Sequence, residues 1–151
     1  MVPVPIDDID RAIIRALQVD GRMAYSKLGP EVGLSRAAAR QRVHRLLDGG
    51  VIEVVAVSEP LKMGYSVQAM VGIEVDGDVR AVSEALVNVE ELVYVVLTAG
   101  RFDLITEVIC KDPQQLFDIV NDVIRKAPGV RSTEVFTYMN IEKVVYSWGT
   151  G

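Results

Sequence analysis

Apolar residues recur at helical spacing in the first fifty residues of the chain, which predicts a cluster of short helices. The first is expected from Asp7 to Gly21, where four apolar residues form one stripe. These are Ile9, Ile13, Ala16 and Leu17. A second, shorter helix is expected from about Tyr25 to Val32, although Gly29-Pro30 interrupts its pattern.

A third helix is expected from Arg36 to about Leu47, between an N-cap at Ser35 and a stop at Gly49-Gly50. Its inward face is apolar at three positions: Ala39, Val43 and Leu46. Two helices joined by a short glycine-containing turn, the second of them basic, are typical of a helix-turn-helix. Ordinary helical bundles also contain such turns, so the spacing alone leaves both interpretations open.

The outward face of this third helix carries most of the candidate chemistry. It holds four arginines, a histidine and a glutamine in a chain whose net charge is −5, which favours polyanion binding over an ordinary solvated face. Gln41, His44 and Arg45 are placed to read base edges, although a solvated side chain is an equally good interpretation of His44. Arg40 and Arg42 are placed to hold phosphates. The candidate DNA-binding residues are Ser35, Arg36, Ala37, Ala38, Arg40, Gln41, Arg42, His44 and Arg45.

The second half of the chain alternates strand-like and helix-like segments after a linking strand expected at residues 52–58. Further strands are expected at residues 66–75, 92–98, 103–111, 130–138 and 141–146. Helices are expected at residues 79–87 and from the cap Asp112 to a break at Pro128-Gly129. The buried face of the latter is expected at Leu116, Val120 and Val123. The order βαββαβ is that of the split βαβ, ferredoxin-like arrangement.

The segment 92–98 is apolar on both faces. One face carries Val93, Val95 and Leu97, and the other carries Tyr94 and Val96. Helices can cover only one face of this sheet, so the other face must meet a partner, and a second copy of the chain is the simplest one. A solvated second face would need more polar residues than are present. A homodimer is therefore expected.

Charge and composition separate the two halves and narrow the class of protein. Residues 1–60 carry no net charge and residues 61–151 carry the whole −5, which indicates two modules with different partners. The single cysteine, Cys110, excludes an intrachain disulfide, and its apolar surroundings predict a buried thiol in a cytoplasmic protein. No apolar run approaches the roughly 18 residues of a membrane span, and the N-terminus lacks the features of a signal peptide. No membrane partner is expected.

Four blocks of the N-terminal half read DDIDRAIIRALQVDGRMAYSKL, VGLS, RQRVHRL and GGVIE. Together they resemble the Lrp/AsnC ("feast/famine") family of transcription regulators. In the second half, the turn Gly100-Arg101-Phe102-Asp103 is similar to the family's G-x-x-D turn, and Gly129-Val130 with Thr133 matches its G-V…T segment. The resemblance covers about residues 6–146. The chain departs from it at Gly29-Pro30, where the family has helix formers, and at Arg36-Ala37, where proline or serine is common.

The resemblance implies an α+β fold in three parts. These are a winged helix-turn-helix DNA-binding domain at residues 1–51, a linker strand and hinge at 52–64, and a ferredoxin-like βαββαβ (ACT-like, RAM) effector-binding and oligomerisation domain at 65–151. It implies a sequence-specific transcriptional regulator that is cytoplasmic and nucleoid-associated. Its expected partners are double-stranded DNA, an amino-acid effector and further copies of the chain, as a homodimer that assembles to a tetramer or octamer.

The resemblance also implies an effector site, because family members bind small effectors, usually amino acids, near the G-x-x-D turn where dimers meet. Backbone N–H groups of residues 99–101 would hold a carboxylate, and Asp103 would accept from an α-ammonium group. Phe102, Leu97 or Leu104 would line a side-chain pocket. The alternative is an ordinary hairpin turn in which Asp103 caps its own backbone. The candidate effector-binding residues are Leu97, Thr98, Ala99, Gly100, Arg101, Phe102, Asp103, Leu104 and Thr133.

An enzymatic role is not expected. One histidine and one cysteine do not make a metal site, and His44 has no catalytic set around it in the sequence. No glycine fingerprint for a nucleotide is present, so neither a metal nor a cofactor is expected. Siroheme decarboxylases share the two-module layout but rely on histidines in the C-terminal half, where this chain has none. The remaining alternative is a stand-alone metabolite sensor or partner-binding module with a vestigial helix-turn-helix.

Overall fold

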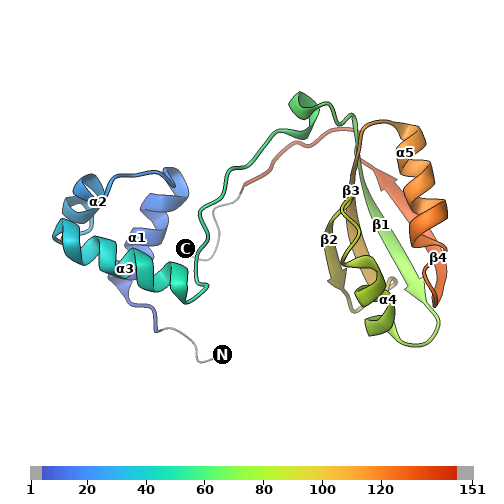
Figure 1. Cartoon of the computed structure of the whole chain (residues 1–151), viewed down its shortest axis with the longest axis horizontal. Helices are drawn as coiled ribbons and strands as arrows, with labels where there is room; N and C mark the ends of the chain where they lie inside the picture. Colours follow the sequence, from blue (N-terminus) through green and yellow to red (C-terminus); the bar gives the residue numbers. More distant parts are fainter. Residues whose placement is uncertain (1–4, 146–151) are drawn as a thin grey trace. The chain divides into compact units, whose positions relative to one another are not determined.

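The computed structural model describes residues 5–145 and divides them into two compact units. The first comprises residues 5–57 with 143–145, and the second comprises residues 58–142. Helices alone make up the first unit, whereas the second combines a four-stranded sheet with helices (Figure 1). Each unit has its own cluster of buried apolar side chains.

The helices of the first unit are α1 (Asp8–Val19), α2 (Tyr25–Glu31) and α3 (Arg36–Asp48). A capping box begins α1: the Asp7 carboxylate accepts from the Asp10 N–H at 2.8 Å, and the Asp10 carboxylate accepts from the Asp7 N–H at 3.1 Å. Ser35 caps α3 by accepting from the Ala38 N–H at 3.2 Å. All three predicted helices are thus confirmed, with small shifts at their ends.

The core of the first unit lies where the three helices meet. The predicted inward face of α3 is confirmed, because Ala39, Val43 and Leu46 are all buried. Their buried neighbours on α1 and α2 are Ile13, Ile14, Ala16 and Leu28. Since these side chains are apolar, their burial is the main force that holds α3 against the other two helices, and it leaves the polar side of α3 in solvent.

Gly29 and Pro30 do not break α2, which runs on to Glu31. The Gly29 carbonyl accepts from the Leu34 N–H at 2.7 Å, so the turn before α3 lies directly on the end of α2. A Cβ at position 29 would come within 2.8 Å of the Leu34 carbonyl oxygen and 3.1 Å of the Arg36 nitrogen. Glycine is therefore required here, and the departure from the family pattern corresponds to a close approach of two backbones.

The second unit has the predicted βαββαβ order. Its elements are β1 (Val67–Val75), α4 (Val79–Leu86), β2 (Leu92–Leu97), β3 (Leu104–Cys110), α5 (Pro113–Asp118), the π-helical segment η2 (Ile119–Ile124) and β4 (Val130–Thr137), preceded by the 3-10 turn η1 (Pro60–Met63). The strands pair antiparallel in the order β2-β3-β1-β4. This is the topology of the ferredoxin-like fold.

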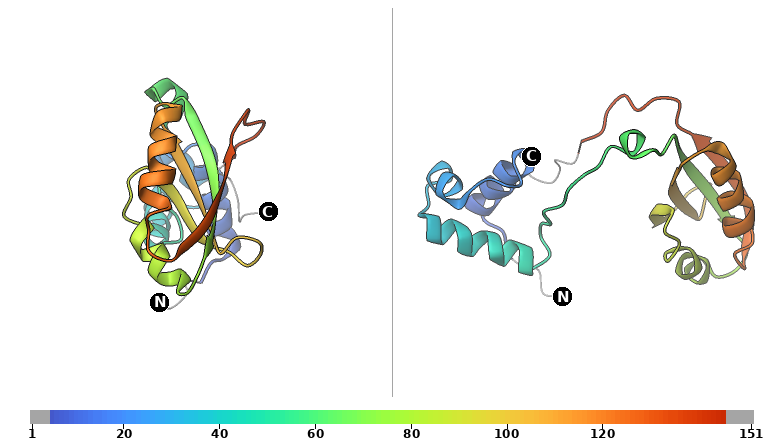
Figure 2. Two further views of the ribbon diagram at one scale, coloured as in Figure 1. Left: turned by 90° about the vertical axis from the view of Figure 1, so that its right-hand side faces the viewer. Right: turned by 45° about the horizontal axis from the view of Figure 1, so that its top comes forward.

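Both helical segments lie on the same face of the sheet, as the edge-on view in Figure 2 shows. The core forms between them and that face, and it includes Val71, Ile73, Val82, Leu86, Leu104, Val108, Ile119 and Ile124. The register places Met70 beside Phe136, and Met70 and Tyr94 on either side of Glu107, so these residues share the opposite face. We call this the open face. Three of its apolar residues are 37% (Met70), 56% (Tyr94) and 44% (Phe136) exposed.

Cys110 ends β3 and is fully buried in the core of the second unit, as predicted. Burial, together with the nearby carboxylates of Glu91 and Asp112, raises the pKa of its thiol to about 11. The thiol is therefore neutral at physiological pH and behaves as a small apolar side chain.

Two predicted strands are wrong. Residues 52–58 form no strand, and neither do residues 141–145; Tyr146, the end of the second prediction, lies outside the described residues. A strand requires a hydrogen-bonded neighbour, and β-rich composition alone does not supply one. Val54, Val55 and Val57 are accordingly more than half exposed. The described part of the first unit therefore has no strands from which a wing could be built.

The predicted buried face after Asp112 is only partly right. Asp112 caps α5 by accepting from the Gln115 N–H at 2.8 Å, and Val120 is buried. Val123 is only half-buried, and Ile124 takes the core position instead. In the π-helical turn of η2, residues five apart, Ile119 and Ile124, lie on one face and are both buried.

We predict that Gly29→Ala destabilises the first unit by about 1–3 kcal/mol, because the added methyl overpacks the contact between α2 and the turn. The loss exceeds the gain of up to about 1 kcal/mol in helix propensity. Hydrogen exchange of the amides of α2 and α3 measures the loss of stability. Gly21→Ala is the control, since its Cβ would make an ordinary 3.4 Å contact with Val54. Equal protection in the two variants would contradict the prediction.

Candidate nucleic-acid interface and effector turn

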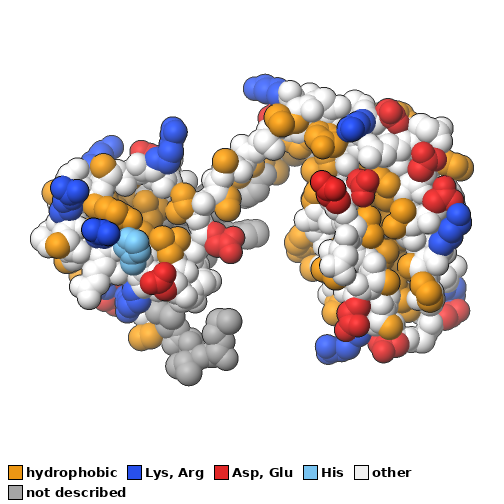
Figure 3. All heavy atoms as spheres, viewed as in Figure 1, with side chains coloured by type: hydrophobic (Ala, Val, Ile, Leu, Met, Phe, Trp, Pro, Cys, Tyr) orange, Lys and Arg blue, Asp and Glu red, His pale blue; other side chains and the backbone are white. Residues whose placement is uncertain are grey.

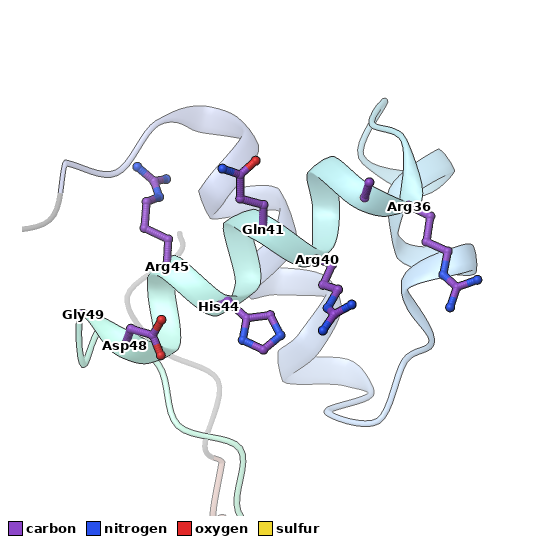
Figure 4. A pocket seen from close by; sticks show the side chains of 8 residues that line it. Arg36, Arg40, Gln41, His44, Arg45, Asp48 and Gly49 are labelled. Atoms are coloured by element: carbon purple, nitrogen blue, oxygen red, sulfur yellow. The ribbon is translucent and has the colours of Figure 1, made fainter.

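The outward side of α3 forms a shallow open surface that contains most of the predicted DNA-binding residues. Its lining residues are Arg36, Ala37, Arg40, Gln41, His44, Arg45, Asp48 and Gly49. Figure 4 shows Gln41 and Arg45 toward one edge of this surface and Arg36, Arg40 and His44 toward the other. In Figure 3, a basic side chain and hydrophobic side chains lie beside the chain's single histidine, with an acidic side chain below it.

Three predicted residues lie outside this surface and two others were missed. Ser35 serves as the N-cap, Ala38 is half-buried, and Arg42 turns toward α1. Asp48 and Gly49 line the surface but were not predicted. Asp48 could have been predicted from the sequence, because it follows His44 by four residues and Arg45 by three, and residues at these spacings share a helix face.

Two of the four arginines of α3 form ion pairs with the start of α1. Arg42 Nη1 lies 2.7 Å from Asp7 Oδ2 and 2.9 Å from Asp10 Oδ1, and Arg45 Nη2 lies 2.5 Å from Asp10 Oδ2. The Asp10 side chain is 1% exposed, whereas those of Arg42 and Arg45 are 29% and 41% exposed. Both carboxylate oxygens of Asp10 are therefore used, and the buried charge is fully partnered.

The electrostatics of Asp10 follow from these contacts. Burial acts to raise the pKa of its carboxyl group, but hydrogen bonds from Arg45, the Asp7 backbone and Arg42 outweigh it and lower the pKa from 3.8 to about 2. Hydrogen bonds to Asp7 and Asp10 raise the pKa of Arg42 in return. Asp10 is thus ionised throughout the physiological range.

Arg36 and Arg40 differ from this pair. Within residues 5–145, neither side chain has a hydrogen bond or an ion pair, and both residues are exposed. His44 is also exposed, with its ring 6.4 Å from that of Tyr25. The side chains of Arg36 and Arg40 are therefore available to contact a ligand. DNA contacts of Arg42 and Arg45 remain a prediction, and the ion pairs of these two arginines argue against it.

The G-x-x-D turn between β2 and β3 is held by four hydrogen bonds. The Thr98 N–H donates to the Asp103 carbonyl at 2.9 Å, and the Thr98 hydroxyl donates to the Phe102 carbonyl at 2.6 Å. The Asp103 N–H donates to the Ile73 carbonyl at 2.9 Å, and Asp103 Oδ2 accepts from the Val75 N–H at 2.8 Å. Asp103 therefore fastens the turn to β1 rather than capping its own backbone.

Phe102 leaves the turn and lies over Gly72 of β1. A Cβ at position 72 would be 2.5 Å from the Phe102 ring, so only glycine admits it. The ring packs edge-on against Phe136 at a centroid distance of 6.1 Å, and the Arg101 guanidinium lies 5.1 Å from its centroid. Arg101 also pairs with Glu134 at 2.6 Å. Phe102 thus adds an aromatic ring to the open face, and Arg101 adds its ion pair with Glu134 beside that ring.

The other predicted effector residues do not all gather beside the turn. Leu104 is fully buried in the helix-side core, so it lines no surface. Thr133 pairs with Ile73, which places it on the helix side of the sheet, and its hydroxyl accepts from Arg125 Nε at 2.8 Å. Ala99 and Gly100 are exposed at the tip of the turn, and Leu97 is 51% exposed. A site that used Phe102 and Thr133 together would need groups from both faces of the sheet.

Among residues 5–145, no three His, Cys, Asp or Glu side chains gather closely enough to hold a metal ion. No helix in that range is long and apolar enough to cross a membrane.

Acid should weaken the contact between α1 and α3. The pKa of Asp10 is lower in the folded chain than its ordinary 3.8, so its contribution, on the order of 2 kcal/mol, is complete above pH 3.8 and lost as the pH falls toward about 2. Urea unfolding followed through the methyl signals of Ile13 and Leu46 measures the loss. Asp10→Asn should be less stable and lack this pH dependence, and Asp8→Asn, on the exposed side of the same turn, should retain it. An unchanged acid dependence in Asp10→Asn would refute the assignment.

Two protein-family models match the chain. The AsnC-type helix-turn-helix domain matches residues 6–47, and the PF0864 C-terminal dimeric alpha+beta barrel domain matches residues 65–151. The HTH-type transcriptional regulator PYRAB01370 of Pyrococcus abyssi is 35% identical over 97% of this chain and 91% of that protein. Together the two models and this relative cover both units.

Solved structures extend the comparison. The leucine response regulatory protein LrpA of Mycobacterium tuberculosis has a TM-score of 0.81 at 30% identity, over 92% of this chain and 96% of its own. The regulator NMB0573 of Neisseria meningitidis, solved as a complex with L-Met, has a TM-score of 0.87 over 96% of this chain and 97% of its own; at 21% identity it shows a shared fold. The chain belongs to the Lrp/AsnC family of helix-turn-helix transcriptional regulators.

Proposed function

We propose that the chain recognises specific DNA sequences by placing the outward face of α3 in the major groove, under the control of an amino acid bound near the Gly100 turn. The observation that carries the first part is the division of α3 into two faces. Its apolar face is buried, whereas Arg36, Arg40, Gln41 and His44 are exposed. Glutamine and arginine form bidentate contacts with base edges, and arginine also binds phosphates.

A homodimer would present two such helices to DNA. The apolar open face of the sheet supports dimerisation, since Met70, Tyr94 and Phe136 would leave solvent in the interface. The matched C-terminal family model is itself described as dimeric. A symmetric dimer would read two half-sites about one helical turn, roughly 34 Å, apart. We further propose that the dimers assemble to a tetramer or octamer and that the protein is associated with the nucleoid in the cytoplasm.

An amino acid is the effector that the turn suits best. The N. meningitidis regulator of the same fold was solved with L-Met. Exposed Ala99 and Gly100 would offer backbone N–H groups to the effector carboxylate. Asp103 uses one carboxylate oxygen to hold Val75, which leaves the other for an α-ammonium group. Because Thr133 lies on the other face of the sheet, a site that includes a Thr133 side chain would need groups from more than one protomer.

Replacing Arg40 by Ala should weaken binding to all DNA about equally, whereas Gln41→Ala should cost about 1–3 kcal/mol at particular base pairs and relax the choice of base there. Fluorescence anisotropy with the DNA upstream of the chain's own gene, and with base-substituted versions of it, measures both effects. Arg80→Ala, an exposed arginine of the second unit, is the control. Undiminished affinity after removal of both Arg36 and Arg40 would defeat the proposal and favour a metabolite sensor with a vestigial helix-turn-helix.

One of the twenty amino acids should raise the melting temperature, with a stabilisation of about 2.7 kcal/mol at a hundredfold excess over Kd. Asp103→Asn is the sharpest variant, because its amide oxygen still accepts from the Val75 N–H while the charge that would attract an ammonium group is gone. It should melt close to wild type without ligand and lose the shift. The pocket is wrongly assigned if Asp103→Asn responds like wild type.

A further inference from the structure

The arginines of α3 are not equivalent, and Asp10 divides them. Arg42 and Arg45, one turn apart, converge on the two carboxylate oxygens of this residue. Asp10 is itself fixed, because its carboxylate also accepts from the Asp7 N–H and its own N–H donates to Asp7. Arg36 and Arg40, on the same helix, have no such partner within residues 5–145.

The ion pairs change the charge that α3 presents. Arg42 and Arg45 are balanced by Asp7 and Asp10, so this group of four side chains carries no net charge. The free positive charge of the helix is reduced to Arg36 and Arg40, with His44 beside them. A polyanion approaching α3 therefore meets two available guanidinium groups per chain, half of the four that the helix carries.

We propose that Asp10 is a positioning residue for DNA recognition: it holds Arg42 and Arg45 against α1, so that Arg36 and Arg40 bind phosphates and Gln41, with His44, reads bases. The inference rests on the proposed DNA-binding function. Arg42 or Arg45 could reach DNA only by leaving a buried carboxylate short of a partner, and that penalty exceeds the return from one base or phosphate contact.

The selectivity of the regulator follows from this arrangement. Phosphate contacts are independent of sequence and increase the affinity for all DNA, whereas base contacts discriminate. By keeping two arginines from the phosphates, Asp10 lowers the affinity for random DNA. Contacts with base edges then supply a larger share of the total binding free energy.

The salt dependence of DNA binding tests this directly, because each phosphate contact adds about 0.9 to the slope of log K against log salt. Arg40→Gln should reduce the slope by about 2 per dimer, without lowering the melting temperature. Arg42→Gln, the same change two residues away, should leave the slope unchanged and lower the melting temperature by several degrees. Anisotropy titrations at several salt concentrations, below the melting range of both variants, give the slopes. Equal losses of slope in the two variants would overturn the inference.

The Asp10→Asn variant should change the salt dependence in the opposite direction to Arg40→Gln. Freed from a full charge partner, Arg42 and Arg45 should steepen the slope by as much as about 3 to 4 per dimer, and the ratio of operator to random-DNA affinity should fall severalfold. If Asp10→Asn does not fold, the comparison of Arg40→Gln with Arg42→Gln still decides, because neither of those variants removes the buried carboxylate. A folded Asp10→Asn variant with wild-type slope and wild-type ratio would refute the inference. A wild-type chain that binds no DNA would instead remove the proposed function, and the inference with it.

Discussion

The N-terminal unit depends on one buried carboxylate. Asp10 is at the start of α1, and a charge in that position is tolerable only with partners on every side. The capping box supplies one partner, and Arg42 and Arg45 supply the others. Only one rotation of α3 brings both arginines to Asp10, so the ion pairs and the apolar core specify the same docking of the two helices. With that docking, Arg40, Gln41 and His44 face outward together.

The C-terminal unit follows a different constraint, the asymmetry of its sheet. Its helices cover one face, and the open face keeps Met70, Tyr94 and Phe136 in solvent. The G-x-x-D turn is attached to this face through two residues: Asp103 binds the backbone of β1, and Phe102 occupies the space that Gly72 leaves. A change in how the open face is covered would therefore act on the turn directly.

Local patterns in the sequence predicted most of the fold. Helical spacing located the three N-terminal helices and the buried Ala39, Val43 and Leu46, and alternation located four strands. The failures have physical causes. Residues 52–58 have β-rich composition but no neighbouring strand within the described residues, and the π-turn at Ile119–Ile124 changes a helical period that sequence reasoning took as constant.

The candidate site was harder to predict, because it depends on contacts between distant segments. Arg42 and Arg45 were identified as basic residues on the correct helix, but their pairing with Asp10 requires α1 and α3 to be docked. The signal was present as two matched spacings, Asp7 with Asp10 and Arg42 with Arg45, each three residues apart. Similarly, nothing in the composition of β1 indicated that Gly72 makes room for Phe102.

Chromatin pull-down with sequencing measures whether the outward face of α3 recognises specific DNA in the cell. We expect enrichment of an imperfect palindrome whose half-sites are centred about one helical turn apart, and loss of that enrichment in a Gln41→Ala strain that still produces folded protein. Enrichment of no motif by the wild-type chain, or an identical motif in both strains, would contradict this expectation.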